Sequence, residues 1–466
     1  MKRSLFLAPA LLALTACAMA PTYVRPEVPT AATGFEEDGA WRQARPGMAD
    51  DRSPWWQAYG DPQLDDLVKR AIAANLTLKG AEAQLRQSQA LAQSAASSWW
   101  PTVGVNGQAT RQRAAALSGA QTYDTRAGAL QASWEPDFWG RVRSSVDAAD
   151  ATARASEADL AAARLTVQAS VVNLFAQIRV NDALIEALQR TIEGYGKALK
   201  IAQSQLRAGV ATPADVALAQ STLASTQAQL VDVQLARKQS EHALAVLLGL
   251  APADFHLPAA ALTLNLPVMP PQLPSQLLER RPDIAAAELR VQAANAEIGV
   301  ARAAWFPHLV FNASGGGTAL GLWASAPQRV WALGAALTGT LFDGGLRSAQ
   351  NAQAVAAFDQ QVASYRQTVL GSFQEVEDNL AALRELAAER ELQDQALAAA
   401  RESERVLLKQ YQAGTNTYVA LINAQALSLN AERTLVQLRG REFAASVALT
   451  KALGGGYTSS QANTNN

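Results

Sequence analysis

Apolar and polar positions follow a helical period over most of the chain and alternate in four shorter stretches. The segments that we expect to be helices are residues 64–99, 141–207, 213–248, 282–304, 345–412 and 417–453. The alternating, strand-like stretches are residues 102–112, 123–134, 307–315 and 330–341. In the first of them Val103 and Val105 fall on one face, whereas Asn106 and Gln108 fall on the other. The pattern predicts an α+β chain with two strand hairpins among long helices.

These elements occur twice in the same order. Residues 76–101 and 282–307 are both Ala-rich helical patterns that end in an aromatic pair and a proline, about 206 residues apart. The motif FWGRVR at residues 138–143 is echoed by FDGGLR at residues 342–347. The period is too long for a solenoid and has the size of a domain. The expected segments are repeat 1 at residues 63–255, a Pro-rich linker at 256–281 and repeat 2 at 282–455.

Two of the expected helices are unusually long. Roughly 67 residues at about 1.5 Å per residue extend about 100 Å, which a globular domain does not need. Helices of this length pack side by side as coiled coils, and abundant alanine permits their close approach. Their polar faces would meet water.

The chain ends carry separate signals. Lys2 and Arg3 precede a short apolar core, so residues 1–17 are expected to be a signal peptide. The segment ends in Leu-Thr-Ala-Cys, which resembles a bacterial lipobox with Cys17 as the lipidated residue; an ordinary secretory signal with an incidental cysteine is the alternative. Ala18 then indicates the outer membrane by the rule for lipoproteins. We expect residues 18–62 to be extended chain wrapped on the protein, and residues 456–466 to be disordered.

Composition excludes several classes of function. A net charge of −1 argues against a nucleic-acid partner. His242, His256 and His308 lack metal-ligand spacing and are interpreted as surface or packing residues. No nucleophile and base are grouped, so we expect no catalytic residues, no metal and no cofactor, and no enzyme activity.

Tryptophans gather around the strand-like stretches. Seven of the ten lie at or beside them: Trp99, Trp100, Trp134, Trp139, Trp305, Trp323 and Trp331. Such residues form belts at the two interfaces of a transmembrane barrel, although hairpin packing in a soluble sandwich is the alternative. Four strands in hydrocarbon would leave unpaired edges, so the barrel must close with other chains. Because about eight strands enclose only side chains, an open pore suggests at least three chains.

Several motifs together resemble a known family. They are the lipobox at residues 14–17, the segment from Trp55-Trp56 to Asp61-Pro62, PDFWGRVR at 136–143, RRPDIAAAELRVQAANAEIGVARAAWFP at 280–307, FDGGLR at 342–347 and YQAGTNTYVALINAQ at 411–425. The chain resembles the TolC-like outer-membrane factors of tripartite efflux systems, in their NodT/OprM-type lipoprotein branch.

The resemblance implies a homotrimer whose twelve-stranded β-barrel lies in the outer membrane and continues as a periplasmic α-helical barrel. Its partners would be a periplasmic adaptor, or membrane fusion protein, and an inner-membrane pump, often of the proton-driven RND type. The channel would give small toxic compounds or drugs a passive exit. Two alternatives stay open: the channel of a type I protein secretion system, and a structural coiled-coil lipoprotein of the periplasm.

The resemblance also places a gate at the periplasmic tip of the helices, near the turns at Gly209 and Gly414. Two acidic positions and a basic one in the TolC pattern correspond to Ala420, Asn423 and Asn416, so the charged gate is missing in repeat 2. The gate candidates are Asp215, Tyr411, Tyr418, Val419, Leu421 and Asn423. Asp215 could equally be a first-turn residue favoured by the helix dipole, and the apolar candidates could be interhelical packing.

Overall fold

The computed structural model describes residues 19–28, 54–116, 119–263, 266, 280–320 and 328–455. The predictions for the signal peptide, Cys17, Trp323, most of the linker and the tail at 456–466 lie outside these residues. The chain divides into two compact units. Unit 1 takes Met1–Glu27, Ala83–Glu157 and Ala286–Gln367, and unit 2 takes Val28–Glu82, Ala158–Ala285 and Thr368–Asn466. Each unit therefore draws segments from both repeats.

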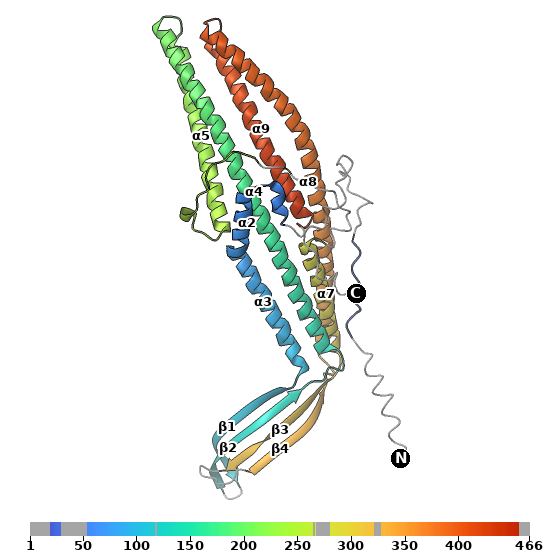
Figure 1. The fold of residues 1–466 in the computed structure, drawn as a ribbon. Helices are drawn as coiled ribbons and strands as arrows, with labels where there is room; N and C mark the ends of the chain where they lie inside the picture. Colours follow the sequence, from blue (N-terminus) through green and yellow to red (C-terminus); the bar gives the residue numbers. More distant parts are fainter. Residues whose placement is uncertain are drawn as a thin grey trace. The chain divides into compact units, whose positions relative to one another are not determined.

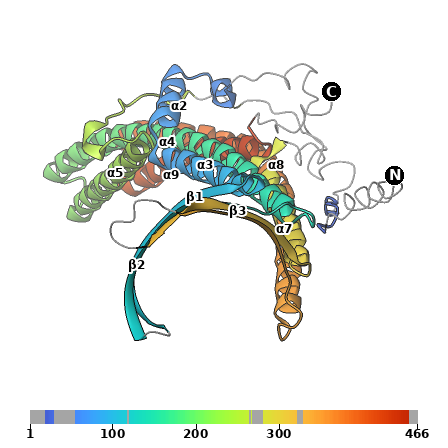
Figure 2. The ribbon, with the colours of Figure 1, turned by 90° about the horizontal axis from the view of Figure 1, so that it is seen from below.

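The four predicted strands form one antiparallel sheet in unit 1 (Figure 1). They are β1 (Thr102–Ala116), β2 (Gly119–Trp134), β3 (His308–Leu320) and β4 (Gln328–Thr338), in the order β1-β2-β3-β4. The two hairpins are confirmed, and β2 of repeat 1 also pairs with β3 of repeat 2, so that Trp134 lies opposite Phe311. Figure 2 shows the sheet as a curved wall. Its edges, β1 and β4, have no strand partner among the described residues.

The long helices are confirmed. Helices α4 (Arg141–Arg207) and α8 (Leu346–Gln412) contain 67 residues each. Each is followed, after a glycine turn, by a helix of 35 residues: α5 (Pro213–Leu247) in repeat 1 and α9 (Tyr418–Ala452) in repeat 2. Repeat 2 begins with helix α7 (Pro282–Ala303). Two short 3₁₀ turns are η4 (Ser97–Trp99) and η5 (Pro252–Asp254).

The single helix predicted over residues 64–99 is wrong. The structure has two helices, α2 (Pro62–Ala74) and α3 (Leu76–Ala96), which are separated at Asn75. The Asn75 Oδ1 atom accepts a hydrogen bond from the Leu78 amide at 3.0 Å, and its Nδ2 donates to the Leu247 carbonyl at 2.9 Å. An asparagine that bonds to backbone in this way competes with helix continuation. The expected cap of the first helix is present, because Asp61 accepts from the Gln63 and Leu64 amides.

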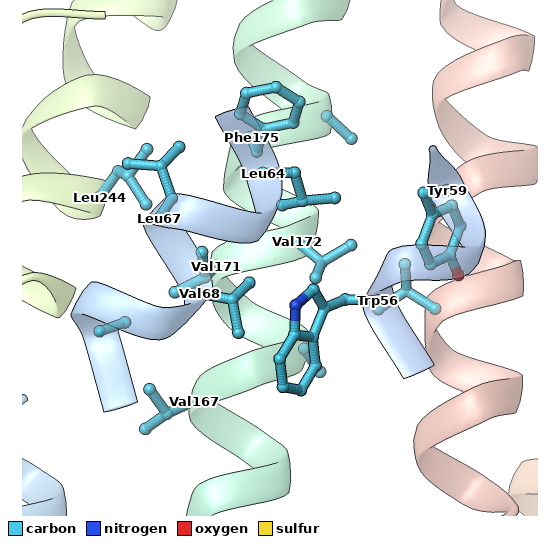
Figure 3. Packing of buried hydrophobic residues seen from close by; sticks show 14 of the residues in the cluster. Trp56, Tyr59, Leu64, Leu67, Val68, Val167, Val171, Val172, Phe175 and Leu244 are labelled. Atoms are coloured by element: carbon cyan, nitrogen blue, oxygen red, sulfur yellow. The ribbon is translucent and has the colours of Figure 1, made fainter. Parts of the chain in front are cut away.

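A hydrophobic cluster holds unit 2 together (Figure 3). Leu64, Leu67 and Val68 of α2 pack against the α4 side chains around Val172. The 3₁₀ helix η3 (Trp55–Tyr59) adds Tyr59, whose ring centroid lies 4.5 Å from that of Phe443 in α9. Three regions that are distant in sequence, namely η3 with α2, then α4, and then α9, therefore share one core.

The extended course expected for residues 18–62 is wrong at Trp55–Tyr59, which form the 3₁₀ helix η3 because Trp56 and Tyr59 are buried in the core. Residues 19–28 have no regular secondary structure, in agreement with the prediction. In unit 1, Arg25 forms an ion pair with Glu288 of α7, and Asn295 of the same helix donates to the Pro21 carbonyl. Arg366 of α8 donates to the Glu27 carbonyl. These bonds fix the segment along α7 and α8.

Candidate functional site

The strand register gives the sheet one apolar and one polar face. Residues directly opposite each other on neighbouring strands point to the same side of a sheet. One such row crosses all four strands and consists of Val103, Ala132, Ala313 and Leu333. The same face carries Val105, Leu130, Trp134, Phe311, Trp331, Ala335 and Leu337. The other face carries Thr102, Asn106, Gln108, Thr110, Gln131, Ser133, Asn312, Ser314 and Thr318. A strand between lipid and an aqueous lumen needs this alternation.

The apolar face is uncovered in the single chain. Val105 is 83% exposed, Leu333 75% and Trp331 77%. An apolar patch of this extent marks a surface that meets another protein or a membrane.

Most of the predicted interface tryptophans gather where the strands join the helices. The Trp134 Nε1 donates to the Trp99 carbonyl at 3.0 Å, and the Trp139 Nε1 donates to the Pro307 carbonyl at 2.8 Å. The Trp139 ring stacks on Phe306 at 4.8 Å. Trp305 lies under the Arg347 guanidinium, and Trp100 is exposed. Trp331 lies apart from them, near the start of β4.

This junction also contains an ion pair that the sequence did not predict. Glu135 pairs with Arg141 at 2.8 Å and its carboxylate lies 3.2 Å from the His308 ring nitrogen. Partial burial opposes ionisation of Glu135, but the hydrogen bonds from Arg141 and His308 prevail and lower the pKa of its carboxyl group. His308 is thus a packing residue with a polar partner, in agreement with its interpretation from the sequence. The described residues contain no cluster of His, Cys, Asp and Glu that could hold a metal.

In unit 2, the two helix pairs end in turns of the same backbone geometry. Gly209 and Gly414 have φ angles of 75° and 71°, a left-handed conformation in which glycine avoids a Cβ clash. Thr212 caps α5 and forms a capping box with Asp215, as the first-turn alternative for that residue predicts. Thr417 caps α9 through the Ala420 amide, without a carboxylate.

Three of the gate candidates are buried among helices of one chain. Tyr411, Tyr418 and Leu421 are 2%, 4% and 0% exposed. They share a cluster with Tyr195 of α4 and Ala219 of α5, and the two candidate tyrosine rings are 5.7 Å apart. Burial raises the pKa of Tyr418 to about 12. This packing favours the interhelical alternative for these three side chains.

The other three candidates are accessible. Val419 is 48% exposed, Asn423 is exposed and Asp215 is half-buried. Hydrogen bonds from the Thr212 amide and hydroxyl lower the pKa of Asp215, so it carries a negative charge at neutral pH. Burial first, and the Asp215 charge second, raise the pKa of Tyr411.

A buried ionic network at the start of the linker was also missed. Arg179 and Asp182 of α4 pair with each other, and Arg237 of α5 pairs with both Asp182 and Glu241. The network holds the chain after α5, because Arg179 donates to the Pro258 carbonyl and Glu241 accepts from the Leu257 amide. The spacing of the pairs Arg179–Asp182 and Arg237–Glu241 was the available sequence signal.

Among the helices that the structure describes, none combines the length and the apolar character required to cross a membrane.

Comparisons with known proteins agree with this geometry. The model of the family described as outer membrane efflux protein matches residues 67–250 and 273–455. The pyoverdine export outer membrane protein OpmQ of Pseudomonas aeruginosa is 31% identical over 469 residues, which cover 98% of this chain and 98% of the relative. Outer membrane protein OprJ of the same organism is 32% identical and covers 96% of this chain and 94% of its own length.

Solved structures are similar in fold over nearly the whole length. The outer-membrane channel OprN superposes with a TM-score of 0.87 at 28% identity, covering 94% of this chain and 99% of the channel. The open state of the MtrE outer membrane channel of Neisseria gonorrhoeae gives a TM-score of 0.84, also at 28% identity, covering 94% and 98%.

Proposed function

The chain belongs to the outer membrane efflux protein family, and from this premise we propose how it forms an exit for small compounds. It is an outer-membrane channel of the efflux type, as its relatives are. Three copies form one pore, which a periplasmic adaptor and an RND-type inner-membrane pump supply with toxic compounds or drugs. The observation that carries the proposal is the two-faced sheet with both edges open. Three four-stranded sheets provide twelve strands, which is enough for a water-filled lumen.

Two measurements test this function. Deletion of the gene should raise the susceptibility of the cell to pump substrates, and the purified trimer should conduct ions in planar bilayers. Two results would contradict the proposal. One is a trimer that does not conduct, and the other is a deletion strain whose susceptibility is unchanged for every compound that the partner pump exports. Secretion of a protein that stops on deletion would favour the type I alternative.

The join between repeats supplies a template for the join between copies. Val103 pairs with Ala132, and its counterpart Leu309 pairs with Leu337, so Ala132 and Leu337 are equivalent positions. Ala132 lies opposite Ala313 across the repeats, and the repeat-1 counterpart of Ala313 is Gly107.

Leu337 of β4 would therefore lie opposite Gly107 in β1 of the next copy, and Ala336 opposite Gln108. This register is consistent with the faces of the sheet, because it matches an apolar-face position with another and a polar-face position with another. A shift by one residue would put each β4 side chain on the wrong face.

At the junction with the helices, Leu341 and Phe342 are 100% and 89% exposed. They occupy the turn of repeat 2 that corresponds to the repeat-1 turn packed on Phe306 and Pro307. In the trimer they would pack near the exposed Trp100 of the next copy.

The tip gate has a separate proposal. The cluster around Tyr418 fixes the tip helices to one another, while Val419, Asn423 and Asp215 face the narrowed pore. We expect Tyr418→Ala to loosen the tip and Asp215→Ala to remove one ring of charge, and either should raise the leak conductance of the closed channel in planar bilayers. Unchanged closed-state conductance in both variants would remove these residues from the gate.

The anchor is also a proposal. Cys17 is the one cysteine in the sequence and ends the lipobox-like segment. Cys17→Ser should abolish palmitate labelling while leaving the channel in the outer membrane through its strands. Labelling that persists in this variant would contradict lipidation at Cys17.

A further inference from the structure

The charged side chains of the described sheet are confined to one end of its apolar face. Strand register places Arg111, Arg113, Arg126 and Arg329 on the same side as Val103, Leu130 and Leu333. They lie toward the distal end of the sheet, which is the end of the β1–β2 and β3–β4 connections. The polar face, which water would solvate, has no Lys, Arg, Asp or Glu among the strand positions whose side chains are described.

The surroundings leave these arginines free to meet a ligand. On the apolar face, Arg126 lies directly opposite Ala109 and Ala319, and Arg329 lies opposite Gly317. A Cβ added at Gly107, Gly128 or Gly315 would meet nothing within 4 Å. Small neighbours therefore form a flat floor on which long side chains can converge.

The charge of this arginine patch, defined as Arg111, Arg113, Arg126 and Arg329, is mostly uncompensated. Asp124 lies 3.7 Å from Arg111, and the Arg111 side chain is still 73% exposed. The other three arginines form no ion pair with any residue that the structure describes. Arg111 and Arg126 are diagonal neighbours on adjacent strands, a spacing of about 7–8 Å that lets two guanidinium groups reach one phosphate.

The position of the patch matches a membrane surface. Trp134 ends β2 at the junction with the helices, and the eight positions from there to Arg126 extend about 26 Å along the strand. Because barrel strands tilt by about 45°, a strand needs about 9–11 residues to cross the bilayer, and Arg126 is the ninth residue counted from Trp134. With the helices in the periplasm, the arginine patch lies at the level of the outer-leaflet head groups.

We propose that the arginine patch binds the phosphate groups of lipids in the outer leaflet, above apolar residues that contact the acyl chains. The ligand must be both anionic and apolar, because basic and apolar residues are continuous on one face. Arginine suits this role, since its planar group binds phosphate oxygens in pairs and its stem lies on apolar surface. The orientation rests on the proposed channel function, whereas the binding itself does not depend on conduction.

The experiment measures lipid binding to the purified trimer by native mass spectrometry. The probes are bisphosphorylated lipid A and its fully dephosphorylated form. The variant carries Arg113→Gln, Arg126→Gln and Arg329→Gln. A matched control carries Arg86→Gln, Arg143→Gln and Arg154→Gln, which removes the same charge from exposed helix positions of unit 1.

The patch variant should bind the bisphosphorylated lipid roughly a hundred-fold more weakly, since each arginine near a membrane surface contributes roughly five-fold. The control and the unaltered protein should bind alike and prefer the phosphorylated probe. Equal binding of both probes, or of the patch variant and the control, would overturn the proposal. Competition by inorganic phosphate at similar concentration would overturn a lipid source in favour of a free anion. A variant that still forms trimers and conducts leaves the channel function intact in either case.

Discussion

The two repeats end their helix pairs with the same backbone but different side-chain chemistry. At the tip, the Val210 and Thr415 amides make equivalent bonds to the Gln205 and Gln410 carbonyls, at 2.9 and 3.0 Å. Repeat 1 adds the Asp215 carboxylate. Repeat 2 instead uses a neutral side chain. The Asn416 Nδ2 donates to the Gln410 Oε1, and the Asn416 Oδ1 accepts from the Thr417 backbone amide.

At the C-terminal ends of α5 and α9 the contrast is reversed, because the neutral side chain now bonds to α5 and the charged one to α9. In repeat 1 the neutral Asn75 donates to the Leu247 carbonyl. At the equivalent place directly before α7, the buried Arg281 donates to the Ala452 carbonyl at the end of α9 and pairs with Asp283 and Glu375. Duplication thus preserved the glycine turns and the backbone contacts, while the polar groups that secure them diverged.

The largest effect should come from the glycines that follow α5 and α9. Gly249 and Gly454 have φ angles of 69° and 87°, and an added Cβ would lie 2.8 Å from the Ala74 carbonyl oxygen or 2.4 Å from that of Arg280. Gly454→Ala should cost about 4 kcal/mol and Gly249→Ala about 3 kcal/mol of folding free energy. The matched control is Gly414→Ala, because its Cβ would meet nothing within 4 Å and only the left-handed backbone costs about 1 kcal/mol. Thermal melting of the trimer, followed by helical circular dichroism, should rank the three variants in this order. Equal melting of Gly454→Ala and Gly414→Ala would contradict the close packing.

The next largest effect should come from the buried polar side chains that bond to the last turns of α5 and α9, namely Asn75 and Arg281. Arg281→Met leaves the Ala452 carbonyl unsatisfied and two carboxylates unpaired, and should cost about 2 kcal/mol after allowance for the exposure of Glu375. Asn75→Ala removes a cap and one backbone bond, and should cost about 1 kcal/mol. The same melting experiment compares them. If Asn75→Ala lowered the melting temperature more than Arg281→Met, the neutral Asn75 contact would stabilise the fold more than the charged Arg281 contact, which would contradict this ranking.

The smallest effect should be the loss of local stability at the repeat-1 tip when Asp215 is protonated at low pH. The pKa of Asp215 is lowered in the folded protein by bonds from Thr212. Its contribution to the tip is therefore complete above the unfolded pKa of about 3.9, and is lost as the pH falls through the lower folded value. Amide hydrogen exchange should show that the turn at Gly209 loses protection in this window, whereas the turn at Gly414 does not. Asp215→Asn should remove the difference, and equal acid sensitivity of the two turns in the unaltered protein would contradict the comparison.

The sequence predicted the elements because their causes are local. Helical periodicity, the capping threonines and the glycine turns placed α4, α5, α8 and α9 within one or two residues. The break at Asn75 was missed because its Nδ2 partner, Leu247, lies 172 residues away in the chain. The Arg281–Glu375 pair was missed for the same reason, since its members lie 94 residues apart. The sequence could not decide whether Tyr411 and Tyr418 line a pore or pack between helices, since a tyrosine on a helix suits both and only the neighbouring helices settle its burial.

The central claim is that copies join as the repeats join, which a disulfide cross-link tests most directly. Ala336→Cys combined with Gln108→Cys puts two thiols opposite each other on the polar face if Leu337 lies opposite Gly107 of the next copy. Mild oxidation should then convert the protein into covalent dimers and trimers that survive boiling in detergent. The matched controls pair Ala336→Cys with Asn106→Cys or Thr110→Cys, one step along the same face, and should link poorly. Stronger linking by either control, or monomers alone for all three pairs, would contradict the account.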